Sequence, residues 1–175
     1  MTLADLLGTD PTTAYGVRSA AVERSRWPLV AEGVRDLGWA LFDLLTAVDL
    51  EADGFEVVLR VWDPRARDGL VLRTRCPRDD ARLPTLTAVW AGAAWHERTT
   101  AEMFGIAFEG HATDRLLLPE RFEGHPLRKE FVLAARVAQP WPGAKEPGES
   151  SADLAGAAPS RRRPQPPGVP TGWPA

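Results

Sequence analysis

Hydrophobic and polar side chains alternate along two segments in the middle of the chain. In residues 55–62 the apolar side chains Phe55, Val57, Leu59 and Val61 fall on one face of an extended chain, and residues 70–75 alternate in the same way. This period of two is typical of half-buried β-strands. A largely apolar run at residues 41–48 predicts a third strand, and this one should be buried.

The three predicted strands are separated by short turn signals. Asp53-Gly54 and Asp68-Gly69 lie between the runs, and glycine after aspartate supplies the positive φ that tight turns need. We therefore expect a three-stranded antiparallel meander. Residues 14–23 predict one further, weaker strand.

Two helices are predicted around this meander. Ser25 can cap a helix that carries Pro28 in its first turn and ends near Leu37 at Gly38. Beyond Pro84 the period changes, and apolar residues from Leu86 to Phe104 recur at roughly helical spacing, so an amphipathic helix should run up to Gly105. Residues 105–131 are rich in glycine, proline and charge and are expected to be irregular.

The elements together predict an α+β fold, a β-sheet of antiparallel or mixed type with helices packed on one face. The predicted domain covers residues 1–139. From residue 140 to 175 nine of 36 residues are proline, so few side chains are suited to a core and an extended or disordered tail is expected.

Composition and charge exclude several functional classes. No apolar run approaches the ~18 residues of a membrane span, and the first residues lack the basic and apolar regions of a secretory signal. A net charge of −3 argues against nucleic-acid binding through phosphate neutralisation. The one cysteine, Cys76, permits no intramolecular disulfide, fits a reducing compartment, and is expected to be an inert packed thiol.

The candidate chemistry is sparse. His96, His111 and His125 lie 15 and 14 residues apart, without the close spacing of a zinc motif, so surface or hydrogen-bonding histidines are favoured over a metal site. Glu97 and Glu102 are five residues apart and would not share a helix face, so separate ion pairs are favoured over acid–base catalysis. Nucleophile-elbow and phosphate-loop motifs are missing.

The segment His125-Pro126-Leu127-Arg128-Lys129 has two interpretations. Proline stiffens the chain and the preceding Gly124 permits an unusual backbone angle, so two cations would project from a rigid turn. They would suit a carboxylate-bearing partner surface, or they would simply be solvated.

Three strings in the last third of the predicted domain carry a family resemblance. They read ERTTAEMFGI at residues 97–106, FEGH at 108–111 and FEGHPLRKEF at 122–131. In this order and spacing they resemble the 30-kDa subunit of respiratory complex I, which is the C subunit of bacterial NADH:quinone oxidoreductase. Residues 45–49 and 86–95 resemble it as well, and Thr99 departs from it by standing where the family pattern has glutamate.

The resemblance implies a non-redox structural subunit in the peripheral arm of a proton-translocating enzyme complex. It would brace the quinone-site D subunit, of the 49-kDa type, near the B and I subunits, on the cytoplasmic side of the membrane. FMN, Fe–S clusters and quinone would be bound by partner subunits, with no catalytic, cofactor or metal residue in this chain. The implied partner-binding residues are those of the motifs: Glu97, Arg98, Glu102, Phe104, Gly105, Gly110, His111, Gly124, His125, Pro126, Leu127, Arg128 and Lys129.

Two more specific expectations follow for this segment. Arg98, Glu102, Arg128 and Lys129 should form ion pairs between subunits or within the scaffold. The backbone polar groups of residues 105–131 and of the proline-rich tail should be satisfied only inside a complex.

Other assignments remain open at this point. A homologous subunit of an energy-converting hydrogenase or a cofactor-F420 dehydrogenase would carry similar motifs. A free-standing metal hydrolase would need the three histidines to converge. A stand-alone interaction module would act through its proline-rich tail on SH3-like domains.

Overall fold

The computed structural model describes residues 2–14 and 16–132, and the predicted boundary at residue 139 and the tail lie outside them. Residues 1–131 form one compact unit. Its helices are α1 (Leu3–Leu7), η1 (Arg24–Arg26), α2 (Trp27–Asp36), η2 (Glu51–Asp53) and α3 (Ala93–Phe104). Its strands are β1 (Thr12–Ala14), β2 (Val17–Ala21), β3 (Leu41–Asp49), β4 (Phe55–Asp63), β5 (Asp68–Cys76), β6 (Arg82–Pro84) and β7 (Ala107–Glu109).

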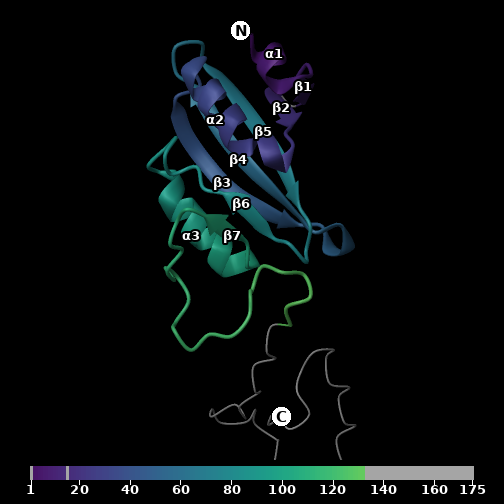
Figure 1. The fold of residues 1–175 in the computed structure, drawn as a ribbon, viewed down its shortest axis with the longest axis vertical. Helices are drawn as coiled ribbons and strands as arrows, with labels where there is room; N and C mark the ends of the chain where they lie inside the picture. The colour runs from purple at the N-terminus through teal and green to yellow at the C-terminus, as the bar shows by residue number, and fades with distance from the viewer. Residues whose placement is uncertain (1, 15, 133–175) are drawn as a thin grey trace, which may run out of the picture. The chain divides into compact units, whose positions relative to one another are not determined.

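The main sheet has five strands in the order β1-β2-β5-β4-β3. The meander β3-β4-β5 is antiparallel, as predicted, while β2 joins β5 in parallel and makes the sheet mixed. The strands β6 and β7 form a separate parallel pair. Figure 1 shows α2 lying over the sheet, with α3 beside β6 and β7 towards one end of it. The α+β class and its mixed sheet are therefore confirmed.

The core lies on one face of the sheet. Strand neighbours across the meander, Leu45, Leu59 and Leu72, are all buried there, and the inner side of α2 adds Trp27 and Val30. The Phe104 ring at the end of α3 packs edge-on against the Phe55 ring, with 6.2 Å between the ring centroids. Helices thus cover the face that the alternating pattern marked as apolar.

The strand at residues 41–48 was predicted to be buried, and this is wrong for one of its two faces. β3 is an edge strand with Leu45, Ala47 and Asp49 buried, whereas Leu41 and Val48 are 54% and 46% exposed. An apolar run indicates full burial only where a second layer covers the strand. Among the described residues no helix covers this second face.

The turn predicted at Asp68-Gly69 is also misplaced. Both residues belong to β5, and the chain turns at residues 64–67, where Arg67 adopts a φ of +55°. Gly69 instead makes room for the Trp62 ring on the neighbouring strand, since a Cβ at this position would lie 2.9 Å from it. At the other turn the prediction is confirmed, because Gly54 has a φ of +86°.

The predicted helix starts are both wrong, while the ends are confirmed. The 3-10 turn η1 runs directly into α2, so Ser25 lies inside a turn, and Arg26 precedes the helix without a side-chain cap. The helix predicted from Leu86 begins only at Ala93. It ends at Gly105, whose φ of +73° is the left-handed conformation that terminates helices.

Candidate interaction site

Glu97 of α3 is fully buried and forms hydrogen bonds to chain segments that precede and follow the helix in the sequence. Its carboxylate accepts the Leu86 N–H and the Thr85 hydroxyl, each at 2.6 Å. The ring nitrogen Nδ1 of His111 lies 3.0 Å from the same carboxylate. These contacts join the turns that precede Ala93, and the segment that follows the helix, to the middle of α3.

Glu102, further along α3, binds main-chain N–H groups of the irregular segment that follows the helix. Its carboxylate accepts the N–H groups of Leu117 at 2.9 Å and Leu118 at 2.7 Å, and that of Leu116 at 3.4 Å. Burial alone would raise the pKa of this carboxyl, but the three N–H groups and the nearby Arg115 outweigh it and hold the pKa below its usual value. The carboxylate therefore stays ionised at neutral pH.

Arg98 binds the same irregular segment from the exposed side of the helix. Its guanidinium donates to the carbonyl oxygens of Asp114 and Arg115, each at 2.9 Å, and lies over the Trp95 ring. Arg98 and Glu102 were expected to form ion pairs. Among the described residues they bind main-chain groups instead.

The segment around His125 packs against the end of α3. Nδ1 of His125 lies 2.9 Å from the Glu102 carbonyl, and the Arg128 guanidinium donates to the Phe104 carbonyl at 2.7 Å. These side chains thus bond to carbonyls that the last turn of a helix leaves free. A Cβ on Gly105 would collide with both, so glycine serves here for close approach as well as for its backbone angle.

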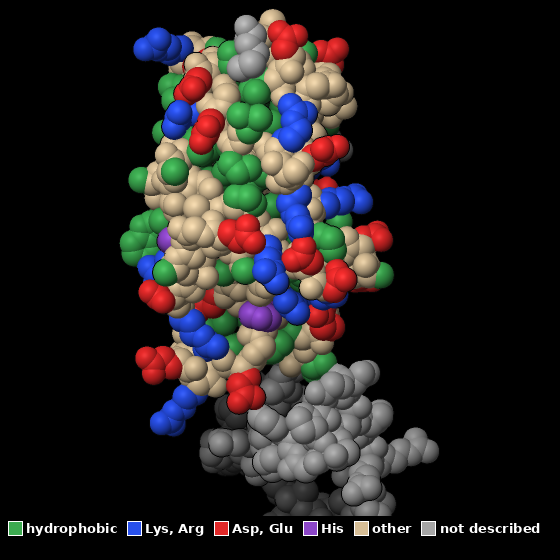
Figure 2. Space-filling view, in the orientation of Figure 1, with side chains coloured by type: hydrophobic (Ala, Val, Ile, Leu, Met, Phe, Trp, Pro, Cys, Tyr) green, Lys and Arg blue, Asp and Glu red, His purple; other side chains and the backbone are tan. Residues whose placement is uncertain are grey.

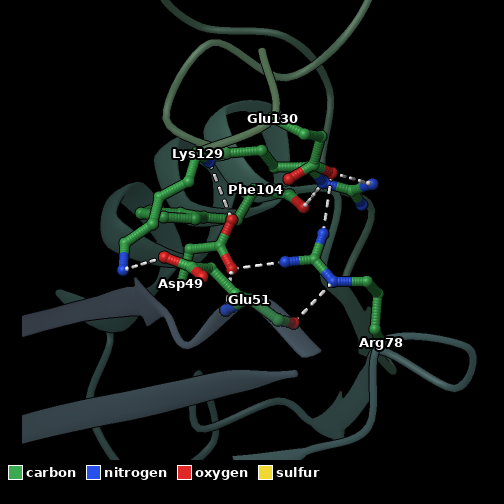
Figure 3. Close-up of polar contacts among 7 residues, drawn as sticks. Asp49, Glu51, Arg78, Phe104, Lys129 and Glu130 are labelled. Atoms are coloured by element: carbon green, nitrogen blue, oxygen red, sulfur yellow. Dashed lines mark hydrogen bonds and ion pairs between the residues drawn. The ribbon is translucent and has the colours of Figure 1, made fainter. Parts of the chain in front are cut away.

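Asp49 is the second anchor of this segment, although it is not among the implied partner-binding residues. It is 3% exposed at the end of β3, and its carboxylate accepts the N–H of Lys129 at 2.9 Å and that of Glu51 at 2.8 Å. It is also paired with the guanidinium of Arg78. Figure 3 shows Asp49 between the main chain of Lys129 and the Arg78 side chain. The only signal for it in the sequence is its place in residues 45–49, which resemble the family.

Exposed ion pairs surround this anchor. Lys129 pairs with Glu51 at 2.9 Å, and Arg78 pairs with Glu130 at 2.7 Å. Burial would raise the pKa of Asp49, but the two N–H groups and Arg78 together lower it. The expectation that residues 105–131 find partners only inside a complex is therefore wrong for these groups, which bond within the chain.

The three histidines do not converge. His111 bonds to Glu97, His125 to the Glu102 carbonyl, and His96 lies 3.2 Å from the Leu45 carbonyl through Nδ1. The described part of the chain contains no group of three His, Cys, Asp or Glu side chains that could hold a metal ion. The convergence that a metal hydrolase needs is therefore not seen in these residues.

An open apolar groove lies between α3 and the edge strand β3. It has a volume of about 250 Å³ and is lined by Leu44, Thr46, Trp95, Thr99, Met103 and Leu127, among others. Trp95 and Leu127 are 59% and 55% exposed. Residues 111–131, which bond to α3 and β3, thus supply one wall of the groove through Leu127. Leu117, in the part of the segment that Glu102 binds, is also exposed.

The face of the molecule in Figure 2 shows side chains of both charges interspersed, with apolar side chains between them. No helix in the described residues is long and apolar enough to cross a bilayer. The fold and the site define an α+β protein whose motif side chains hold residues 111–131 against α3 and β3.

Comparison with known families identifies the protein more closely. Residues 20–137 match the family described as the respiratory-chain NADH dehydrogenase 30 Kd subunit, and the chain belongs to this family. It is 45% identical over 82 residues to the C subunit of NADH-quinone oxidoreductase from Roseiflexus castenholzii, covering 46% of this chain and 47% of that protein. It is 34% identical over 142 residues to the C/D subunit from Acinetobacter baylyi, covering 74% of this chain and 24% of that protein. The first match thus spans about half the relative's length.

Two solved structures share the fold. The trypsin-resistant fragment of Nqo5 superimposes with a TM-score of 0.54 at 24% identity, over 57% of this chain and 84% of the fragment. A chain of the membrane-bound sulfane sulfur reductase, an archaeal respiratory membrane complex, superimposes with a TM-score of 0.60 at 22% identity, over 85% and 94%.

Proposed function

We propose that this chain is a structural, non-redox subunit of the peripheral arm of a proton-translocating NADH:quinone oxidoreductase. In this role it braces the quinone-site D subunit and lies near the B and I subunits, on the cytoplasmic side of the membrane. The membrane is reached only through the complex. FMN, the Fe–S clusters and quinone are bound by the partner subunits, and the single cysteine of this chain falls short of the four thiolates that an Fe–S cluster usually takes.

The observation that carries the proposal is the set of hydrogen bonds that hold residues 111–131 against α3 and β3. Glu97, Arg98, Glu102 and His125 direct their polar atoms at neighbouring chain segments, and Asp49 fixes the far end. A segment held this way forms a rigid surface that loses little conformational entropy when a partner binds. The exposed Trp95 and Leu127 give that surface apolar contact area, which suits a protein partner.

The identity of the partner is supported by the relatives. The Acinetobacter baylyi protein is named as a C/D subunit, and this chain matches 24% of it. The C/D name joins the two subunits in one protein. Such a joined protein suits C and D subunits that contact each other in the complex, because fused partners stay adjacent. The groove of Trp95 and Leu127 is then the contact with the D subunit.

One alternative keeps a specific observation in its favour. The same fold covers 85% of this chain in the archaeal sulfane sulfur reductase complex, so it also serves other respiratory membrane complexes. An energy-converting hydrogenase or an F420H2 dehydrogenase complex is the alternative assembly. The identity of the co-purifying subunits separates these assignments.

The test is affinity purification of the tagged full chain from native membranes, with mass spectrometry and an NADH:quinone assay of the eluate. Recovery of the B, D and I subunits with NADH-dependent activity is expected. Recovery of hydrogenase-type subunits would replace the proposal by the alternative, and a chain that elutes alone would overturn both.

A matched pair of variants tests the groove. Leu127→Glu, at a 55% exposed position in the groove, should reduce recovery of the D subunit about tenfold or more. Leu29→Glu, at a 62% exposed position on α2, should leave recovery unchanged. Equal recovery with both variants would show that the groove is not the contact with the D subunit.

A further inference from the structure

The face of the main sheet opposite the helices has no covering layer among the described residues. The strand residues that point to this side, on β3, β4 and β5, include Leu44, Val48, Val58, Trp62 and Val71. Of the residues on this side of those three strands, only Gly69 is buried, beneath the Trp62 ring. Leu44 and Val48 are 38% and 46% exposed. A sheet face with this many apolar side chains is normally covered by another layer.

Arg73 lies in the middle of this face and has no acidic partner among the described residues. It stands between Val58 on β4 and Ala21 on β2, its register neighbours. The two other arginines of this face do have partners: Arg60 pairs with Asp43 at 3.2 Å, and Arg75 with Glu56 at 3.7 Å. The buried Nε atoms of Arg73 and Arg60 both lack a hydrogen-bond partner in the described part of the chain, so Arg73 differs from Arg60 in having no acidic side chain paired with it. A half-buried guanidinium beside Val58 and Ala21 can still accept a carboxylate from a partner protein.

We propose that this uncovered sheet face is a second docking surface, filled by an amphipathic helix of a partner protein that places one carboxylate on Arg73. The carboxylate would pair with the cation that the described residues leave unpaired, and aliphatic side chains one turn away would cover Val58, Val71 and Val48. This surface lies on the other side of the sheet from the core-covering helices, and it is separate from the segment 111–131 on α3.

The size of the uncovered sheet face, and the obstruction at the edge of β3, favour a helix as the occupant over a β-strand added at that edge. Nine-residue strands span roughly 30 Å, and three of them are about as wide as a helix of ~10 Å diameter with its side chains. Strand addition at the free edge of β3 is obstructed, because the His96 ring lies 3.4 Å from the Leu45 nitrogen and 3.2 Å from its carbonyl oxygen. The uncovered face is therefore more accessible than the β3 edge.

The first test is site-specific photo-crosslinking in the assembled complex. A benzophenone amino acid replaces Val58 in the full chain, cells are irradiated, and the purified adduct is analysed by mass spectrometry. We expect an adduct with a second polypeptide, in a helical peptide that carries Asp or Glu within about one turn of the crosslink. An adduct with residues 133–175 of this chain, an adduct with a second copy, or no adduct would overturn the proposal.

The second test uses Arg73 and a matched arginine. Arg73→Met should lower the adduct yield about tenfold or more, while the thermal midpoint of the free chain stays the same or rises, because a half-buried charge without an acidic partner is removed. Arg35→Met, on the opposite side of the sheet in α2, should change neither. Undiminished adduct with Arg73→Met would overturn the assignment of the carboxylate.

A double-mutant cycle tests the pairing directly. Replacing the acidic residue of the captured peptide by its amide should reduce the adduct as Arg73→Met does, and combining both changes should add little further loss. Additive losses would show that the two groups do not pair. If the wild-type chain co-purifies with its complex but Val58 captures nothing, this proposal fails while the proposed function stands.

Discussion

The Asp49 carboxylate accepts the backbone N–H of Lys129 at 2.9 Å, across 80 residues of sequence. Asp49 closes the edge strand β3, and Lys129 belongs to the last motif of the chain. The bond fixes the end of the irregular segment to the sheet, while Glu102 fixes its middle to α3. The surface proposed to meet a partner is therefore set by two buried carboxylates that bind main-chain N–H groups.

Replacing Asp49 by asparagine should destabilise the chain. The amide loses the charge that pairs with Arg78 and can accept fewer hydrogen bonds than the carboxylate. We expect a loss of roughly 2–3 kcal/mol in the free energy of unfolding, measured by urea denaturation of the full chain. Asp53→Asn, at an exposed position in η2, is the control and should change stability little. Equal effects of both changes would contradict the anchor role of Asp49.

Stability should fall in acid. The pKa values of Asp49 and Glu102 are lower in the folded chain than their ordinary values of 3.8 and 4.5. A lowered carboxyl pKa contributes stability that is complete above the ordinary pKa and is lost as the pH falls through the folded value. The urea midpoint should therefore be flat near neutrality and decline below about pH 4.5. The double variant Asp49→Asn, Glu102→Gln should show a shallower decline, and an unchanged slope would contradict this assignment.

Gly105→Ala should disturb the site more than a comparable glycine change elsewhere. Gly105 and Gly16 have φ angles of +73° and +74°, so alanine costs about 1–2 kcal/mol at either position for the backbone alone. Only at Gly105 would the new Cβ meet His125 and Arg128, whereas nothing lies within 4 Å at Gly16.

The two glycine variants are distinguished by hydrogen exchange. Gly105→Ala should speed exchange of the Leu127 amide, which donates to the Met103 carbonyl at 3.2 Å. Gly16→Ala should leave that amide protected. Equal protection in both variants would indicate that the segment does not depend on close approach at Gly105.

Cys76 should report global unfolding. The thiol is fully buried, and burial raises its pKa to about 11. Since the thiolate is the reactive form, a maleimide should label the native chain slowly at pH 8 and the urea-unfolded chain fast. As the chain has a single cysteine, the labelling rate follows one site. Rapid labelling without denaturant would show that β5 opens locally.

Sequence alone was sufficient for the elements whose signal is local. Alternation at residues 55–62 and 70–75 identified β4 and β5, and glycine at residue 105 identified the end of α3, because period and backbone angle depend on nearest neighbours. The order of the three motifs also identified the family. The apolar period could not place the start of α3, because residues 87–92 form turns whose apolar side chains keep a similar spacing.

Only the tertiary structure decided how the apolar strand β3 and the charged motif residues are used. The run at residues 41–48 looked like a buried strand, yet its second face is left uncovered among the described residues, because burial depends on which layers pack on the strand. Arg98 and Glu102 were each expected to form ion pairs between subunits or within the scaffold, yet among the described residues they bind main-chain groups 14 to 17 residues away. The family resemblance of residues 45–49 did not show what Asp49 binds, since its partner Lys129 is brought near only by folding. Composition sets which residues can bond, but the path of the chain selects their partners.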